Sequence, residues 1–564
     1  LKEFHDRFKE WDPTRPIHYE GIFNDRRYPE TSDIESTMYV PVDEIRKWLK
    51  TNRTKPYINC EYMHSMGNST GAMNKYTELA YEDPLFQGGF IWDYIDQCLM
   101  KKDAYGRSFA GYGGDFGDRP TDFDFSGNGI VYGPDREPTP KMQEVRFNYQ
   151  NVRMDFSSEN GRIRMNVENR NLFTDLSEMK CVVRLEREGV FVSEKEMKVS
   201  VAPLDEDVFD LPYGIPGNPG EYTYTVSFLT KEDQPWAPAG HEVAWGQYTV
   251  RVNEKPHTDP LFARMKQPEE KTLPVKPKVI HGAVNIGVEG PGFRLLFSSL
   301  FGGLVSARYA GKEYIERIPR PNFWRAMTQN DIANLQASRS GQWKAASLYA
   351  THRTNHGRGL TPYEITETDH SVKLVYTYHL PVFPAKDAKV SYEVFGDGRV
   401  ETVLSMDQSA DVGELPAFDM LFTLPLSLDR IRWYGLGPEE TYFDRCSAKL
   451  GIYEKNVRDT VAANLVPQET GSHLGTRWAE ILDSEGHGLV FECGGLELSA
   501  LPWSPEELDY AKHPTDLPLP QYTIVRVGRM MGIGGDDTWG ALVHPEYRLD
   551  NTERMEIRFS FKGI

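Results

Sequence analysis

The segment KPYINCEYMHSMGNSTG, residues 55–71, decides the fold class of the N-terminal part of the chain. It opens as an apolar strand over 55–63 and passes, from Glu61 onward, into aromatic, imidazole and amide side chains. A carboxylate followed by such groups is an unusual end for a strand in a hydrophobic core. The same groups suit the floor of a site for a polar ligand, so we expect function at this strand end.

Strands alternate with helices on both sides of this segment. Further strands are predicted over 16–22, 36–42 and 86–95, and helices over 42–50 and 71–82. This alternation indicates βα units of a parallel sheet. Because four strands are half of a (β/α)₈ barrel, residues 1–150 are predicted to form half of such a barrel.

The rest of the chain has the pattern of β structure. Residues 151–262 contain strands in which apolar and polar residues alternate, which predicts an antiparallel β-sandwich. Residues 263–278 are rich in proline and charge and are interpreted as a linker. Residues 279–564 combine short strands with many glycine and proline turns, which predicts a large all-β domain.

Composition excludes several classes of partner. The 564 residues carry a net charge of −19, which argues against binding to nucleic acid or to anionic membrane surfaces. No apolar run approaches the roughly 20 residues that a membrane-spanning helix needs. The five cysteines include no CxxC pair, which favours a reduced chain and makes the cytoplasm the predicted compartment.

The first residues resemble the end of a helix that is already under way. Leu1, Phe4, Phe8 and Trp11 repeat at helical spacing, and no N-cap residue precedes them. We interpret this as a chain that begins inside a domain. The absence of a signal peptide is then no evidence for or against secretion.

Four side chains at the predicted strand ends suit carbohydrate chemistry: Tyr39, Glu61, His64 and Trp92. Retaining glycosidases use one carboxylate as nucleophile and a second as acid and base. They also need aromatic platforms for the apolar face of a sugar, and imidazole or amide groups for its hydroxyls. The N-terminal segment therefore has the residue types of a glycosidase site.

Six motifs, in order along the chain, resemble those of the large bacterial β-galactosidases of glycoside hydrolase family 2. They are CEYMHSMGNS (60–69), QGGFIWDYIDQ (87–97), YGGDFGD (112–118), GNG (127–129), WYGLGPEETYFDR (433–445) and MGIGGDDTWG (531–540). The resemblance covers the whole chain and is to the C-terminal portion of the family. It implies the C-terminal half of a TIM barrel, an immunoglobulin-like β-sandwich and a large galactose-mutarotase-like supersandwich domain.

The resemblance also assigns roles in the barrel. Glu61 would be the nucleophile that forms the galactosyl-enzyme, and Tyr39 would hydrogen-bond it. His64 would hold galactose hydroxyls, and Trp92 would lie under the galactose ring. The structural alternatives are an ion-paired Glu61, core packing of the tyrosine and the tryptophan, and a hydrogen-bonded loop histidine.

Further roles follow for three residues and one loop. The Phe125 backbone carbonyl and Asn128 resemble ligands of a sodium ion near the C6 hydroxyl of the sugar, although a simple glycine and asparagine turn is the alternative. Trp539, from the far β domain, would stack on the leaving-group sugar. Residues 328–341 resemble a mobile loop near the active site.

The acid/base glutamate of the family is not found in this chain. It normally follows an asparagine. The one Asn-Glu pair, Asn253-Glu254, lies shortly before the predicted linker, and Glu20 stands at the wrong position. The magnesium ligands of the family are absent with it. The resemblance thus implies a retaining β-galactosidase for the parent protein, and a chain that is inactive until the missing N-terminal half joins it.

Two rival functions stay open at this point. Another family 2 activity, β-glucuronidase or β-mannosidase, is the nearer one, although those relatives usually lack a domain like residues 279–564. A non-catalytic carbohydrate-binding protein is the other, favoured by the missing acid/base and opposed by the intact nucleophile motif. The predicted partners are a β-galactoside substrate and the N-terminal half, and the oligomeric state, including a homo-oligomer, stays open.

Overall fold

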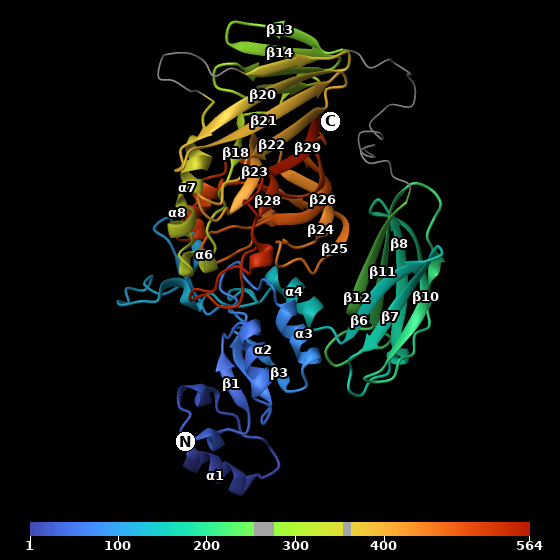
Figure 1. Ribbon diagram of the computed structural model, residues 1–564, viewed down its shortest axis with the longest axis vertical. Coiled ribbons are helices and arrows are strands. Elements are labelled where there is room, and N and C mark those ends of the chain that lie inside the picture. Colours follow the sequence, from blue (N-terminus) through green and yellow to red (C-terminus); the bar gives the residue numbers. More distant parts are fainter. Residues whose placement is uncertain (253–275, 353–362) are drawn as a thin grey trace.

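The computed structural model describes residues 1–252, 276–352 and 363–564 (Figure 1). Residues 263–275 of the predicted linker lie outside the described residues. In the described ranges, no helix has both the length and the apolar character that crossing a membrane requires. Figure 1 shows a small α/β region that includes the N-terminus, a β-sandwich beside it, and a large β region that lies against the α/β region.

The N-terminal region contains a parallel sheet of three strands in the order β1-β2-β3, as the βα alternation predicts. Its elements are β1 (Glu35–Met38), α2 (Val42–Thr51), β2 (Tyr57–Tyr62), α3 (Asn74–Glu82) and β3 (Phe86–Ile91). Helix α2 buries Val42, Ile45 and Leu49 against the sheet, because that spacing places them on one helical face. The strands run parallel, so their carboxyl ends meet at one edge.

The strand predicted over 16–22 is wrong. Residues Glu20–Asn24 form a short 3₁₀ helix, η1, and no strand precedes β1 in the described chain. The backbone N–H of Ile17 donates to the Asp33 carboxylate, and that of Tyr19 donates to the Ser32 hydroxyl. Since side chains take these donors, they are not available for a ladder with β1, and the sheet has three strands rather than four.

Shorter elements complete the N-terminal region. They are α1 (Lys2–Trp11), the 3₁₀ helices η2 (Pro29–Thr31) and η3 (Phe123–Ser126), the hairpin of β4 (Leu99–Lys102) and β5 (Ser108–Gly111), and α4 (Lys141–Asn148). The helix predicted at the start of the chain is confirmed as α1. Its apolar residues Leu1, Phe4, Phe8 and Trp11 are exposed, so this helix face has no packing partner among the described residues.

Two antiparallel sheets, β10-β7-β6 and β12-β11-β8-β9, form the predicted β-sandwich. Its strands are β6 (Val152–Glu159), β7 (Arg162–Asn169), β8 (Met179–Arg187), β9 (Val190–Met197), β10 (Glu206–Gly214), β11 (Gly220–Thr230) and β12 (Glu242–Val252), and η4 (Leu176–Glu178) precedes β8. In β7, Ile163, Met165 and Val167 are buried while the residues between them are more exposed. This period of two places one face of the strand in the core.

The large β region contains a five-stranded sheet, β13 to β17, and a twelve-stranded sheet. The strands of the first are β13 (Lys278–His281), β14 (Asn285–Gly290), β15 (Phe293–Ser298), β16 (Leu304–Tyr309) and β17 (Lys312–Glu313). The twelve-stranded sheet contains β18 (Arg317–Asn322), β19 (Glu364–Glu367), β20 (Ser371–Leu380), β21 (Lys386–Phe395), β22 (Val400–Met406), β23 (Ala417–Pro425), β24 (Arg430–Gly437), β25 (Lys449–Asn456), β26 (Ser472–Leu482), β27 (Gly488–Leu501), β28 (Tyr522–Met530) and β29 (Met555–Gly563). One continuous hydrophobic core joins the two sheets.

Helices interrupt this region where the sequence suggested none. They are α6 (Gln329–Ala333), α7 (Gln336–Tyr349), α8 (Pro505–Tyr510) and the 3₁₀ helices η5 (Val457–Thr460), η6 (Pro514–Asp516) and η7 (Pro545–Tyr547). The segment 328–341, predicted as a mobile loop, therefore consists largely of α6 and the start of α7. Thr328 and Asp331 form a capping box, and Asp331 also accepts two hydrogen bonds from buried Arg325, which fixes the helix start.

The large β region binds the carboxyl edge of the parallel sheet directly. The Gly71 N–H donates to the Gly534 carbonyl, and the Ala72 N–H donates to the Asp444 carbonyl. A Cβ atom on Gly535 would lie 2.4 Å from the Gly71 nitrogen, so glycine is required for this approach. Residues some 460 positions apart in sequence thus meet at the end of β2.

Candidate active site

The end of β2 brings Glu61 beside Tyr39. The Tyr39 N–H donates to the Glu61 carbonyl at 2.8 Å, and Tyr39 has φ 51°, an unusual backbone conformation for a tyrosine. Burial and then the neighbouring Glu61 carboxylate raise the pKa of the Tyr39 phenol. Its buried oxygen has no hydrogen bond of normal geometry within the described residues. A phenol that stays protonated beside a carboxylate is suited to donate a hydrogen bond to it.

His64 follows the strand and is fully buried. Its Nδ1 atom lies 2.8 Å from the Thr538 hydroxyl, and its Nε2 atom lies 3.5 Å from the Asn128 amide nitrogen. Burial, with a smaller contribution from the positive charge of Lys141, lowers the pKa of His64 to about 4. The imidazole is therefore neutral at neutral pH.

Asn128 lies at the Nε2 side of His64, opposite Thr538, and Phe125 lies beside it. The Asn128 amide nitrogen donates to the Phe125 carbonyl at 3.0 Å, and the Phe125 ring centroid is 5.3 Å from that of His64. The Asn128 side-chain oxygen is buried and has no partner among the described residues. A buried amide oxygen without a partner costs free energy unless a ligand satisfies it, which indicates a binding role.

Trp92 stands at the end of β3, next to the segment after β2. Its carbonyl accepts from the Ser65 N–H at 2.7 Å, and its own N–H donates to the Tyr62 carbonyl. These bonds hold the ends of β2 and β3 together. The Trp92 side chain is 38% exposed, so it is not a core residue in this structure.

Trp539 reaches the site from the large β region. Its ring centroid lies 4.6 Å from that of Tyr39, 4.6 Å from that of His64 and 5.6 Å from that of Phe125. The side chain is 51% exposed, so Trp539 is not part of the core of its own domain. The structure thus brings Tyr39, His64, Phe125, Asn128 and Trp539 together, with Glu61 adjacent to Tyr39. Trp92 joins this group through backbone hydrogen bonds.

Two buried basic residues support the site through contacts that the sequence did not predict. Buried Lys141, at the start of α4, donates to the carbonyls of Ser65 and Gly67, and burial lowers its pKa to about 8. Buried Arg445 donates to the Ser69 carbonyl at 2.7 Å. Each lies far along the chain from the carbonyls that it binds, so no local pattern could have revealed the contact, although Arg445 ends the motif 433–445.

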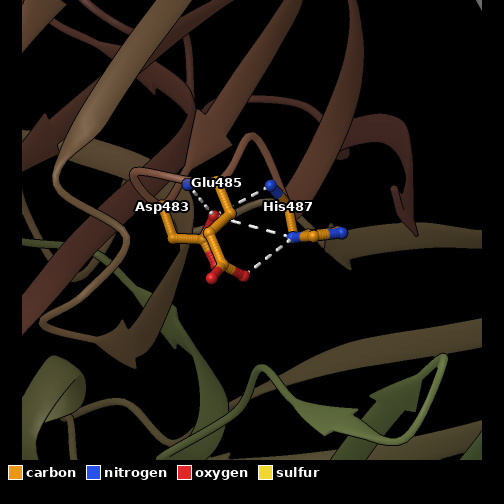
Figure 2. A group of neighbouring side chains, drawn as sticks. All are labelled: Asp483, Glu485 and His487. Carbon is orange, nitrogen blue, oxygen red and sulfur yellow. Dashed lines mark hydrogen bonds and ion pairs between the residues drawn. The ribbon is translucent and has the colours of Figure 1, made fainter.

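One group of side chains in the described part of the chain has the spacing of a metal site, and it lies elsewhere. Figure 2 shows Asp483, Glu485 and His487 in the turn between β26 and β27, with their ligand atoms within 4.8 Å of one another. The Lys312 ammonium lies 3.3 Å from Asp483 and 3.0 Å from Glu485. Because the Lys312 ammonium already pairs with both carboxylates, we assign no metal to them.

Three parts of the chain match known families. Residues 1–154 match the family described as Glycosyl hydrolases family 2, TIM barrel domain, and residues 165–251 match Beta-galactosidase, domain 4. Residues 289–562 match Beta galactosidase small chain. These three ranges follow one another in chain order and cover most of the sequence.

Curated relatives match the chain over nearly its whole length. The chain is 44% identical to a Beta-galactosidase of Halalkalibacterium halodurans over 99% of this chain and 53% of that protein. It is 36% identical to a Beta-galactosidase of Streptococcus thermophilus over 100% of this chain and 55% of that protein, and 36% identical to Beta-galactosidase BgaC of Bifidobacterium adolescentis over 98% and 52%. The chain therefore spans about half the length of the curated relatives that it matches.

Proposed function

Because the chain belongs to glycoside hydrolase family 2 and matches the C-terminal portion of its bacterial β-galactosidases, we propose that it supplies the nucleophile half of a retaining β-galactosidase. The observation that carries this proposal is the position of Glu61. It stands at the carboxyl end of a parallel strand and beside Tyr39, whose ring packs against His64 and against Trp539 of the large β region.

The proposed reaction has two steps. The Glu61 carboxylate attacks the anomeric carbon of a β-galactoside, the bond to the leaving-group oxygen breaks, and an acid protonates that oxygen. Water then attacks the anomeric carbon, the conjugate base of that acid takes the proton of the water, and Glu61 leaves as a carboxylate. Tyr39 orients the nucleophile through its phenol, while His64 and Asn128 bind sugar hydroxyls.

The general acid and the magnesium ion of the family would come from the N-terminal half. The residues that would hold this magnesium are absent from this chain, so no step proposed for the chain depends on it. The exposed edge of the sheet is consistent with a partner that would cover it. Phe90 in β3, and Trp92 and Tyr94 just after it, are exposed. Large aromatic side chains at an unpaired parallel edge favour a surface that another segment covers.

The proposal is tested by complementation. We would co-express this chain with the remaining N-terminal portion of the H. halodurans relative, and we call the product the complemented assembly. Nitrophenyl galactoside should be hydrolysed by the assembly and not by this chain alone. Faster hydrolysis of the nitrophenyl glucuronide or mannoside would favour the rival family 2 activities. Galactose binding without turnover by the assembly would favour a non-catalytic protein.

Phe125 and Asn128 fit a sodium ion in the proposed enzyme. The Phe125 carbonyl oxygen and the unpartnered Asn128 side-chain oxygen belong to groups within hydrogen-bond distance of each other, and a hard cation prefers such oxygen ligands. When bound, sodium would supply positive charge that orients an oxygen of the substrate.

The sodium proposal predicts an effect on stability as well as on activity. Sodium chloride should raise the melting temperature of the complemented assembly more than choline chloride of equal ionic strength does. Asn128→Ala should remove this difference, because it removes one ligand. A sodium effect of unchanged size in Asn128→Ala would exclude the site.

Trp539 is proposed to bind the leaving-group sugar. Trp539→Ala in the complemented assembly should lower kcat/KM for lactose by about tenfold, because the second ring loses an apolar face, whereas nitrophenyl galactoside should change by no more than about twofold. Trp236→Ala is the matched control, since Trp236 is also exposed but lies in the β-sandwich. Equal losses on both substrates would rule out this role.

A further inference from the structure

The hydrogen bonds around His64 fix which of its ring nitrogens carries the proton. The chain of contacts starts at Asn330 in α6, whose amide nitrogen donates to the Ile533 carbonyl at 3.1 Å. That bond orients the amide, so the Asn330 side-chain oxygen faces the Thr538 hydroxyl at 3.0 Å. An amide oxygen only accepts, so the Thr538 hydroxyl must donate its single proton to Asn330.

The orientation of the Thr538 hydroxyl determines which ring nitrogen of His64 is protonated. The Thr538 oxygen lies 2.8 Å from the His64 Nδ1 atom, and its proton is already used. The hydroxyl can therefore only accept from His64, and Nδ1 must carry the ring proton. In a neutral imidazole the other nitrogen, Nε2, then has a lone pair and acts as an acceptor. Its one hydrogen-bond contact among the described residues is with the Asn128 amide nitrogen, and at 3.5 Å this contact is weak.

We infer that Thr538 and Asn330 are positioning residues that hold His64 in the Nδ1–H tautomer, so that Nε2 accepts a hydrogen bond from a sugar hydroxyl. This inference rests on the proposed function for the identity of the ligand, although the tautomer itself does not depend on it. All three side chains are buried, so water does not compete for these bonds. The residue that precedes Trp539 thus sets the polarity of the galactose site.

A second buried histidine, His473, has no such contacts. Both ring nitrogens of His473 are buried without partners, so nothing among the described residues selects its tautomer. His64 differs because three chain segments, the end of β2, helix α6 and the turn 531–540, meet at its Nδ1 side.

The tautomer can be measured in this chain without any activity. In a chain labelled with ¹⁵N-histidine, the His64 signal, assigned by its loss in His64→Phe, should show a protonated Nδ1 and a bare Nε2. Thr538→Val should shift the signal toward the Nε2–H form, and Thr538→Ser should restore it, because serine keeps the hydroxyl. Thr523→Val is the matched control, since the Thr523 hydroxyl is buried and donates to the Leu428 carbonyl instead.

An Nε2–H signal in the unsubstituted chain would overturn the inference, even if every variant failed to fold. A Thr538→Val signal identical to that of the unsubstituted chain would overturn the role of Thr538. An inactive complemented assembly with the Nδ1–H signal would count against the proposed function only.

A second measurement tests the acceptor role in the complemented assembly. We would compare deoxy and deoxyfluoro galactose at positions 3, 4 and 6 as competitive inhibitors. At the position that His64 contacts, both changes should weaken binding by about tenfold, because fluorine cannot donate a hydrogen bond. A fluoro analogue that binds as well as galactose, beside a weak deoxy analogue, would show that Nε2 donates and would contradict the inference.

Discussion

Glu61→Gln is expected to lower kcat of the complemented assembly on nitrophenyl galactoside by about 10⁴-fold or more. The amide of glutamine is too weak a nucleophile to form the ester bond to the anomeric carbon. Substrate binding should change far less, because His64, Asn128 and Trp539 remain. The measurement is steady-state kinetics together with the inhibition constant of galactose.

Glu20→Gln is the matched control for this loss. Glu20 also lies near the sheet, but it is exposed and begins the 3₁₀ helix η1 rather than ending a strand. It should therefore retain activity within about twofold. An active Glu61→Gln assembly, or an equal loss in Glu20→Gln, would remove Glu61 from the nucleophile role.

Arg445→Met is expected to destabilise the large β region by about 3–5 kcal/mol. The Arg445 guanidinium donates to the Glu440 carboxylate and to the Ser69 carbonyl, both at 2.7 Å, and both charged side chains are buried. Removing the cation leaves the Glu440 charge buried without its counter-ion. Urea denaturation, followed by tryptophan fluorescence, would measure the loss.

Two further variants show whether the buried charge causes this loss. Arg445→Met combined with Glu440→Gln should be more stable than Arg445→Met alone, because the glutamine carries no charge. Arg554→Met, at an exposed position, should change the free energy of unfolding by no more than about 0.5 kcal/mol. A double variant no more stable than Arg445→Met would show that lost packing, rather than charge, is the cause.

The strongly patterned elements of this fold could be predicted from the sequence. Helix α2 was predictable because Val42, Ile45 and Leu49 follow the helical period, and strands β2 and β3 were predictable as short apolar runs that alternate with helices. The strand over 16–22 failed because Asp33 and Ser32 take its backbone donors, a competition that its own sequence does not show. Residues 328–341 were predicted as a loop but form helices. Arg325, which lies outside the segment, fixes Asp331 at the start of α6.

The candidate site also contains residues whose position the sequence predicts and residues whose position it does not. Glu61 lies at the end of β2, and His64 and Trp92 follow β2 and β3, so their common edge could be predicted once the strands were known. The approach of Trp539 came from resemblance and not from any pattern in the residues. Thr538, Asn330 and Lys141 could not be found from the sequence, because hydrogen bonds between distant segments leave no period along the chain.

The proposed role of Glu61 requires a covalent bond between its carboxylate and galactose. The direct measurement is mass spectrometry of the complemented assembly after reaction with dinitrophenyl 2-deoxy-2-fluoro-β-galactoside, which forms the glycosyl-enzyme faster than water removes it. Peptide mapping should place the fluorogalactosyl mass on the peptide that contains Glu61, with dinitrophenol released in equal amount. A label on another carboxylate, or steady turnover of nitrophenyl galactoside in an assembly that never acquires a label, would contradict the account.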